Sequence, residues 1–339
     1  MPTTPPTVLL TGASGFLGIH TVSRLRAAGH PVRALVRDRS KLAANLRLLE
    51  IDVDDLEVVE GDLPDQAIVK EAVTGTDAVI HAAATFSLKR RDRAVMEQQN
   101  ELLTRTVLNA GAEHGCDVLV HVSSTVALNR PGGAVLDPHS PLGPGLGPYS
   151  ASKVASERVA RAMQEAQAPV TIVNPGGVVG PDDPYVGENA ESCIAILKNR
   201  LPAWPRGQLH YVDVRDTAEV LTAAVTHEPG GRYLVPGATV PSPFPVLRRV
   251  TGRRLAALTV PAKLATAATM PGYLTGWSFL PGAAEGPRTV GCANPVDSSL
   301  TTEELGVTAR SADDAFRDTV RWLRKAGHIS AREAGNAGD

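Results

Sequence analysis

Short apolar runs alternate with helical patterns along the N-terminal part of the chain. The runs are rich in Val, Leu and Ile and predict six β-strands, over residues 7–10, 32–37, 56–62, 78–83, 118–122 and 169–173. They lack strict alternation of apolar and polar positions, which is typical of strands buried on both faces. Apolar positions at helical spacing predict helices near residues 16–28, 40–50, 64–73, 95–114 and 150–167. This order predicts an α/β fold, with a doubly wound parallel sheet covered by helices on both faces.

The pattern becomes irregular after residue 180, where many prolines interrupt it. An acidic turn and an apolar helix that ends at Val225 indicate a return to the larger domain, and an amphipathic pattern from Ala312 to Lys325 predicts a final helix. The tail after Ser330 is small and polar, and we expect it to be frayed. We therefore expect a larger domain made of residues 1–179, 211–235 and 312–326, and a smaller C-terminal lobe made of residues 180–210 and 236–300.

Composition and charge exclude several classes of protein. The 339 residues carry 34 basic and 36 acidic side chains and a net charge of −2, which gives no electrostatic case for binding nucleic acid or an anionic membrane. The three cysteines are far apart without metal-ligand spacing, so we expect free thiols in a reducing compartment and no metal site. No apolar run approaches transmembrane length, and the N-terminus lacks the features of a signal peptide. We therefore expect a cytoplasmic protein, monomeric or homodimeric.

The stretch TGASGFLG, from Thr11 to Gly18, follows the first strand and opens the first helix. Strand, glycine turn and helix in this order are the context of a dinucleotide-binding fingerprint in a Rossmann-type fold. Gly12 allows the tight turn, Gly15 lets a diphosphate approach the backbone at the helix N-terminus, and Gly18 lets the helix pack closely on the sheet. An ordinary glycine-rich turn is the alternative, and the position between strand and helix argues against it. The candidate cofactor-binding residues here are Gly12, Ser14, Gly15, Phe16, Leu17 and Gly18.

The second strand ends in Arg37, followed by Asp38 and then Lys41. A Rossmann site selects its cofactor at this point, because an acidic residue binds the ribose of NAD and a basic residue accommodates the 2′-phosphate of NADP. Here the cation comes first, so Arg37 can stack on adenine and pair with the phosphate, and Lys41 adds a second charge. The alternative is a solvated Arg37 with Asp38 on the ribose. The sequence therefore favours NADP as the cofactor, with NAD less favoured.

Tyr149 and Lys153 lie four residues apart on a predicted helix and share one face. Hydride transfer to a carbonyl leaves negative charge on oxygen, so a site must supply a proton and hold that oxygen. An ordinary tyrosine pKa of about 10 is too high for this work near neutral pH, and a nearby ammonium group lowers it. Ser124, at the end of the fifth strand, can hold the substrate oxygen beside Tyr149, with Ser123 as the neighbouring alternative. His81 is better explained as a packed histidine at a strand end.

In combination, these motifs resemble the extended short-chain dehydrogenase/reductase family, which contains sugar epimerases, dehydratases and dihydroflavonol reductases. The resemblance covers roughly residues 7–235 and is closest to the dihydroflavonol reductase-like branch. It implies that Ser124 is the catalytic serine and that Lys153 also bonds the nicotinamide ribose. It implies further cofactor-binding residues at the ends of other strands, namely Asp62, Leu63, Ala82, Ala83, Ala84, Pro175 and Val178.

Some of these positions leave alternatives or depart from the family pattern. Asp62 matches a residue that bonds the adenine amino group, and a simple strand-end turn explains it nearly as well. Asn100 matches a family asparagine whose role is more structural than chemical. Asn174 replaces the usual arginine and Val179 the usual tyrosine, which puts any sugar-nucleotide contact of that arginine in doubt.

The sequence favours an NADPH-dependent carbonyl reductase, or the reverse alcohol dehydrogenase, acting on a small molecule with Tyr149 as proton donor. Arg37 favours NADP, whereas epimerases keep NAD bound and recycle it. Apolar lobe segments, such as residues 262–280, suit an aliphatic, aromatic or steroid-like ketone or aldehyde. We expect selectivity in segments 181–210 and 236–290, with the loop 130–148 as a wall. The alternatives are an NAD(P)-dependent sugar-nucleotide epimerase or dehydratase, and a non-catalytic NADP-binding regulator.

Overall fold

A parallel sheet of seven strands forms the centre of the larger domain in the computed structural model, which describes residues 4–85, 92–275 and 285–338. Its order is β10-β6-β5-β4-β1-β2-β3, and every neighbouring pair is parallel. The strands are β1 (Val8–Thr11), β2 (Val32–Val36), β3 (Glu57–Glu60), β4 (Ala78–His81), β5 (Val118–Val122), β6 (Val170–Asn174) and β10 (Arg232–Leu234). The predicted doubly wound α/β fold is confirmed. From β1 the chain adds β2 and β3 on one side, and then returns to add β4 on the other side of β1. Such a switch in strand order is where open α/β sheets bind ligands.

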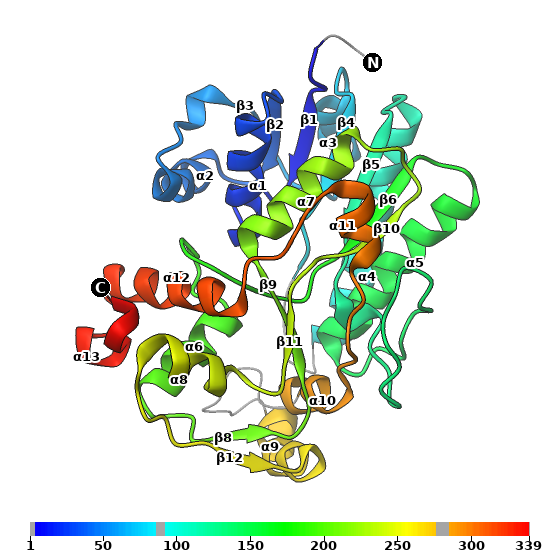
Figure 1. Ribbon diagram of the computed structural model, residues 1–339. Helices are drawn as coiled ribbons and strands as arrows, with labels where there is room; N and C mark the ends of the chain where they lie inside the picture. Colours follow the sequence, from blue (N-terminus) through cyan, green and yellow to red (C-terminus); the bar gives the residue numbers. More distant parts are fainter. Residues whose placement is uncertain (1–3, 86–91, 276–284, 339) are drawn as a thin grey trace.

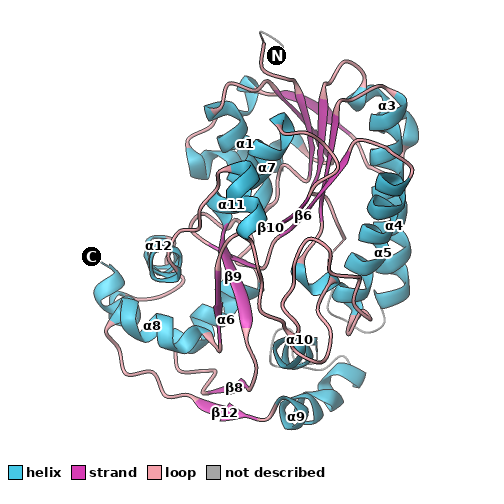
Figure 2. Cartoon of the chain, turned by 45° about the vertical axis from the view of Figure 1, so that its right-hand side comes forward, coloured by secondary structure: helices cyan, strands magenta, loops and turns pink. Residues whose placement is uncertain are grey.

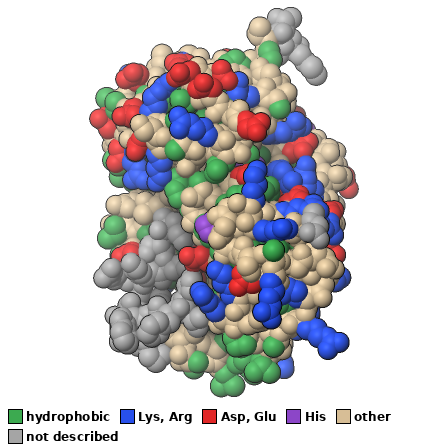
Figure 3. Space-filling model, turned by 90° about the vertical axis from the view of Figure 1, so that its left-hand side faces the viewer, with side chains coloured by type: hydrophobic (Ala, Val, Ile, Leu, Met, Phe, Trp, Pro, Cys, Tyr) green, Lys and Arg blue, Asp and Glu red, His purple; other side chains and the backbone are tan. Residues whose placement is uncertain are grey.

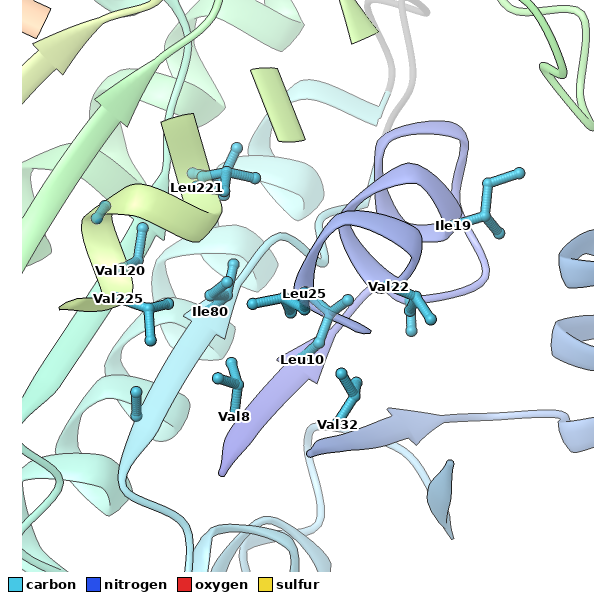
Figure 4. Close-up of a cluster of buried hydrophobic side chains, with 14 of the residues drawn as sticks. Val8, Leu10, Ile19, Val22, Leu25, Val32, Ile80, Val120, Leu221 and Val225 are labelled. Atoms are coloured by element: carbon cyan, nitrogen blue, oxygen red, sulfur yellow. The ribbon is translucent and has the colours of Figure 1, made fainter. Parts of the chain in front are cut away.

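Helices cover both faces of this sheet, as Figure 2 shows. One face packs on α1 (Phe16–Ala27), α2 (Arg39–Leu46) and α7 (Val214–Thr226), and the other on α3 (Gln66–Val73), α4 (Arg93–Glu113) and α5 (Pro148–Glu165). Successive strand residues serve opposite faces: Leu10 packs with Leu25 of α1 (Figure 4), whereas Leu9 packs toward α3 and α4. Burial on both faces explains the largely apolar central strands, such as β1 and β4, whereas the edge strand β3 begins and ends in exposed glutamates.

The smaller lobe begins where the chain leaves β6. It holds a three-stranded sheet in the order β11-β9-β7 and a pair formed by β8 and β12. Its strands are β7 (Gly177–Val179), β8 (Ala203–Pro205), β9 (Leu209–Asp213), β11 (Ala238–Val240) and β12 (Leu258–Val260), and its helices include α6 (Glu188–Leu197), α8 (Pro243–Thr251), α9 (Ala262–Thr275) and α10 (Glu285–Cys292). Figure 1 shows this lobe below the main sheet, facing the carboxyl ends of the strands. Part of the expected lobe, residues 276–284, lies outside the described residues.

The C-terminal part of the chain differs from the expectation. Helix α12 (Ala312–Lys325) packs in the core of the smaller lobe and not on the larger domain, with the ring of Phe316 5.1 Å from that of Tyr211. The tail forms α13 (Ala331–Ala334) and the short η5 (Gly335–Gly338), with Ala334 and Ala337 fully buried, so it is not frayed. Helix α11 (Ser299–Leu305) instead packs against α7 and β10 of the larger domain. Amphipathicity predicts that one face of a helix is buried, but not which surface covers it.

The molecular surface mixes charges of both signs. On the face in Figure 3, Lys and Arg side chains are spread over both lobes, and Asp and Glu side chains lie among them. In the part of the chain that the structure describes, no helix combines the length and the apolarity that a membrane crossing requires.

Candidate active site and cofactor site

The fingerprint turn is built on close backbone contacts. Gly12 has φ +77°, a conformation that favours glycine, and a Cβ there would lie 2.8 Å from the backbone nitrogen of Ala83. The turn after β1 is therefore held against the segment that follows β4. A Cβ at Gly18 would collide with the carbonyl oxygen of Gly12 and with the backbone of Ala13. Gly18 thus lets α1 pack against the turn itself, rather than on the sheet as we expected.

The N-terminus of α1 is open to a negatively charged ligand. Gly15 is its N-cap residue, and no side chain caps the helix. The first-turn N–H groups and the positive end of the helix dipole are therefore available to an anion, and Phe16 and Leu17 are only half-buried there. These features fit the diphosphate of a dinucleotide.

The charged residues that follow β2 are of two kinds, those already paired within the protein and those without an ion pair among the described residues. The Asp38 carboxylate accepts a hydrogen bond from the Lys41 backbone N–H at 2.9 Å and so caps α2, and the Arg39 guanidinium pairs with Asp54 at 2.6 Å. Arg37 is exposed, and neither it nor the Lys41 side chain belongs to an ion pair among the described residues. The two unpaired cations fit a phosphate group, and the capping acid is already engaged.

Further cofactor candidates follow β3 and β4. Asp62 is exposed, and its carboxylate accepts the Leu63 N–H at 3.0 Å, which makes it a strand-end turn residue as well as a candidate ligand. Ala82 and Ala83 are half-buried beside the fingerprint turn, and Ala84 is exposed. Their contacts with a cofactor remain predictions.

The structure distinguishes the two serines after β5. The Tyr149 hydroxyl is hydrogen-bonded to Ser124, whereas the Ser123 hydroxyl donates to the carboxylate of Glu157 at 2.5 Å. Ser124 is therefore the serine that shares a hydrogen bond with the phenol. Burial raises the pKa of Tyr149, the hydrogen bond with Ser124 lowers it, and the charges of Glu285 and Glu188 raise it further.

Lys153 lies one helical turn after Tyr149 on α5 and is buried. Its Nζ donates to the carbonyl oxygen of Val122, the last residue of β5, at 3.0 Å. Burial lowers the pKa of Lys153 to about 8, and the negative charge of Glu157 acts in the opposite direction. The ammonium is thus held at the carboxyl end of β5. Lys153 is not among the groups that shift the pKa of Tyr149, and burial raises that pKa, so the lowering that we expected from a nearby ammonium is not seen in this structure.

Glu157 is the centre of a buried polar network that the sequence analysis missed. It is fully buried, and its carboxylate accepts hydrogen bonds from Ser123, from Asn174 at 2.7 Å and from Arg161 at 2.9 Å. Asn174 also donates to the carbonyl of Ser124 at 3.3 Å. The residue that replaces the family arginine therefore helps to hold the serine loop, which is the segment after β5 that contains Ser123 and Ser124. The available signal was spacing, since Glu157 lies four residues after Lys153 on the same face.

A second missed carboxylate anchors the start of α5. Glu285 of α10 accepts the backbone N–H groups of Tyr149 at 3.0 Å and Ser150 at 2.8 Å. Gly147, the N-cap residue, leaves room for it, because a Cβ there would collide with the Glu285 carboxyl group. Glu188 of α6 belongs to the same acidic region: burial, together with the charges of Glu285 and Glu191, raises its pKa to about 7.

His81 and Asn100 have structural surroundings. The Thr11 hydroxyl lies 2.9 Å from Nδ1 of His81, and the His81 ring stacks on that of His121. Burial and the nearby Lys153 charge lower the pKa of His81 to about 3, so it is neutral at physiological pH, as expected of a packed histidine. Asn100 bonds both the N–H and the carbonyl of Thr85, which ties α4 to the segment after β4.

Pro175 and Val178 lie where the chain crosses from the larger sheet to the smaller one. The Pro175 carbonyl accepts bonds from the Ser124 hydroxyl at 3.3 Å and the Thr125 N–H at 2.8 Å. The Val178 carbonyl accepts the Asn189 side-chain amide at 2.9 Å. This crossing is therefore fixed to the serine loop and to α6, and its contact with a cofactor remains a prediction.

The fold and the grouping of Ser124, Tyr149 and Lys153 at its carboxyl edge define a class, the Rossmann-type oxidoreductases of the short-chain dehydrogenase/reductase kind. Residues 8–235 match the NAD dependent epimerase/dehydratase family, and the chain belongs to that family. It is an NAD(P)-dependent oxidoreductase of the extended short-chain dehydrogenase/reductase type.

Full-length relatives agree with this assignment. The chain is 31% identical to sterol demethylase protein B of Methylococcus capsulatus over 95% of this chain and 100% of that protein. It is 30% identical, over 95% of this chain and 96% of the other, to a Synechocystis protein with a provisional assignment as a dihydroflavonol 4-reductase. The crystal structure of gox2253 matches with a TM-score of 0.80 and 27% identity, over 96% of this chain and 100% of that one.

Proposed function

We propose that this protein reduces a carbonyl group to an alcohol with NADPH, or catalyses the reverse oxidation. The observation that carries the proposal is the hydrogen bond between the hydroxyls of Tyr149 and Ser124, with Lys153 buried one helical turn later on α5 and its ammonium on the carbonyl of Val122. A proton donor, an oxygen-holding hydroxyl and a cation are the groups that carbonyl reduction requires from the protein.

The chain's own residues have separate roles in this reaction. Bound NADPH supplies the hydride that adds to the carbonyl carbon. Ser124 holds the carbonyl oxygen, and Tyr149 donates the proton that converts the oxyanion to an alcohol. Lys153 stabilises the phenolate that remains, which matters because burial disfavours this anion. The negative charge of Glu157 raises the pKa of Lys153 and so favours its charged form. By resemblance, Lys153 also bonds the nicotinamide ribose.

The preference for NADPH over NADH rests on the unpaired Arg37 and on the commitment of Asp38 to capping α2. Arg37→Ala is expected to weaken NADPH binding by ~1.5–3 kcal/mol, because one charge-assisted phosphate contact is lost, and to leave NADH nearly unchanged. The measurement is the dissociation constant of each dinucleotide. Arg39→Ala is the matched control, because that guanidinium already pairs with Asp54. Equal weakening of both dinucleotides by Arg37→Ala would remove the basis for the preference.

An apolar substrate is supported by the names of two relatives, a sterol demethylase protein and a protein assigned to the dihydroflavonol reductases. We infer that an aliphatic, aromatic or steroid-like ketone or aldehyde binds between the carboxyl edge of the main sheet and the smaller lobe. Segments 181–210 and 236–290 would supply its selectivity, and the loop 130–148 a wall.

The reaction is tested with NADPH deuterated at the transferable position and a panel of ketones and aldehydes. A reductase places the label on the alcohol carbon of the product and consumes one NADPH per product. An epimerase or dehydratase acting on sugar nucleotides turns over with no net consumption of dinucleotide. Dinucleotide binding without turnover of the ketones and aldehydes or of sugar nucleotides identifies a regulator instead.

The charge of Glu157 predicts a change in the pH profile. Protonated Lys153 is the active form in this proposal, so activity falls as pH rises through the pKa of Lys153, which is about 8. Glu157→Gln removes the charge that raises this pKa, and the falling limb of kcat against pH is expected to move to lower pH. Glu165→Gln, on an exposed position of the same helix, is the control. An unchanged limb in Glu157→Gln, with the fold intact by thermal unfolding, contradicts the role given to Glu157.

A further inference from the structure

The loop after β7 reaches back from the smaller lobe to the fingerprint turn. The Tyr185 hydroxyl donates to the carbonyl oxygen of Ser14 at 2.9 Å. The same loop is held a few residues earlier, where Nε2 of His20 in α1 lies 3.1 Å from the Pro181 carbonyl oxygen. Two contacts therefore connect this loop to the part of the larger domain that carries the glycine turn and the start of α1.

Helix α2 completes the surroundings of Tyr185. The Asn45 side-chain amide donates to the Ser14 carbonyl at 2.7 Å and to the Tyr185 hydroxyl at 2.8 Å. The Lys41 ammonium lies 4.7 Å from the centre of the Tyr185 ring, within cation–π range. Lys41 and Asn45 are one turn apart on α2. Tyr185 thus contacts both the turn assigned to the diphosphate and the lysine assigned to the 2′-phosphate.

The backbone of the loop presents Tyr185 in a defined way. The carboxylate of Asp183, itself buried, accepts the N–H groups of Tyr185 at 3.0 Å and Gly187 at 2.7 Å. Asp182 has φ +62° and Val186 has φ +49°, and a β-branched residue in this left-handed region is strained. A loop with an internal carboxylate and two left-handed residues is shaped by its surroundings rather than by local preference. The Tyr185 side chain is nevertheless half-exposed, so it can move without opening a core.

We propose that Tyr185 holds the dinucleotide site closed. Its contacts join the smaller lobe to the fingerprint turn and set the rate at which the cofactor is released. A dinucleotide that contacts both the start of α1 and Lys41 lies against the groups that Tyr185 connects. Release of the cofactor then requires the Tyr185 hydroxyl to break its hydrogen bonds with Ser14 and Asn45, and the ring to break its contact with Lys41. The inference rests on the dinucleotide site of the proposed function, but not on the reaction carried out there.

The test is the rate of dinucleotide release from the full-length protein, followed by stopped-flow fluorescence of bound NADPH or NADH chased with excess oxidised cofactor. Tyr185→Ala is expected to release the cofactor at least roughly tenfold faster, because the hydroxyl bonds and the ring contact are both lost. Tyr185→Phe is expected to show a smaller, roughly threefold to fivefold increase, since it keeps the ring over Lys41. Because the ring contacts Lys41, Tyr185→Ala should lower the ratio of NADPH affinity to NADH affinity, and Tyr185→Phe, which keeps the ring, should leave this ratio at the wild-type value.

Tyr233→Phe is the matched control, because it removes a hydroxyl that donates to Glu304. Its strand β10 is at the edge of the sheet, separated from β1 by β6, β5 and β4, so this variant should release cofactor at the wild-type rate. Release rates within twofold of wild type for both Tyr185 variants would overturn the proposal. Faster binding of cofactor with unchanged release would also overturn it, since Tyr185 would then block the site rather than close it. Failure of the reaction proposal is seen separately, as an absence of turnover in a protein whose release rates still respond to Tyr185.

Discussion

Tyr149→Phe is expected to abolish turnover while NADPH affinity stays close to that of the wild-type protein. The ring still packs at the start of α5, and only the hydroxyl that is hydrogen-bonded to Ser124 is removed. Loss of a general acid lowers kcat by ~10²–10⁴-fold. The measurements are kcat on the best substrate of the carbonyl panel and the dissociation constant of NADPH by fluorescence titration.

A control variant and a contrary outcome test whether the loss of turnover comes from the Tyr149 hydroxyl itself. Tyr233→Phe removes another hydroxyl, bonded to Glu304, and should leave kcat unchanged. A Tyr149→Phe protein that binds NADPH normally but keeps most of its activity would exclude Tyr149 as the proton donor. In that case a water molecule would have to supply the proton, because His81 is neutral, buried and bonded to Thr11.

Lys153→Met is expected to impair both turnover and cofactor binding. Its ammonium donates to the β5 carbonyl of Val122 and feels the charge of Glu157, and the proposed function gives it a ribose contact as well as the stabilisation of the phenolate. Loss of a charged hydrogen bond weakens binding by ~1.5–3 kcal/mol, or roughly 10- to 150-fold in the NADPH dissociation constant. A larger loss is expected in kcat, since the Tyr149 phenolate then forms in a buried site without a cation.

Glu157 keeps Arg161 as a counterion in this variant, so the buried carboxylate is not left unpaired. Lys70→Met on α3, away from the carboxyl edge of the sheet, is the control and should change neither constant. An NADPH affinity equal to that of the wild type in Lys153→Met would show that the lysine acts on Tyr149 alone. Unchanged kcat together with unchanged affinity would remove Lys153 from the site.

Local sequence determined much of this protein. The fingerprint could be identified because its strand, turn and helix are contiguous, and Gly12 and Gly18 are required by backbone contacts within that unit or beside it. Tyr149 and Lys153 share a face because of their four-residue spacing alone. The parallel sheet followed from apolar runs separated by helical patterns, since strands buried on both faces leave a continuous signal in the sequence.

Tertiary structure decided the features that depend on pairing between distant segments. Glu285 caps the helix of Tyr149 from 136 residues away, and Tyr185 reaches Ser14 across 171 residues. Ser123 and Ser124 are neighbours with the same chemistry, and only the placement of α5 assigns one to Glu157 and the other to Tyr149. Helix α12 was predicted correctly as a helix, but its partner in the smaller lobe was not. Spacing along a chain reports which residues share a face, whereas the identity of the opposing surface depends on loop closure and packing between lobes, which no local pattern encodes.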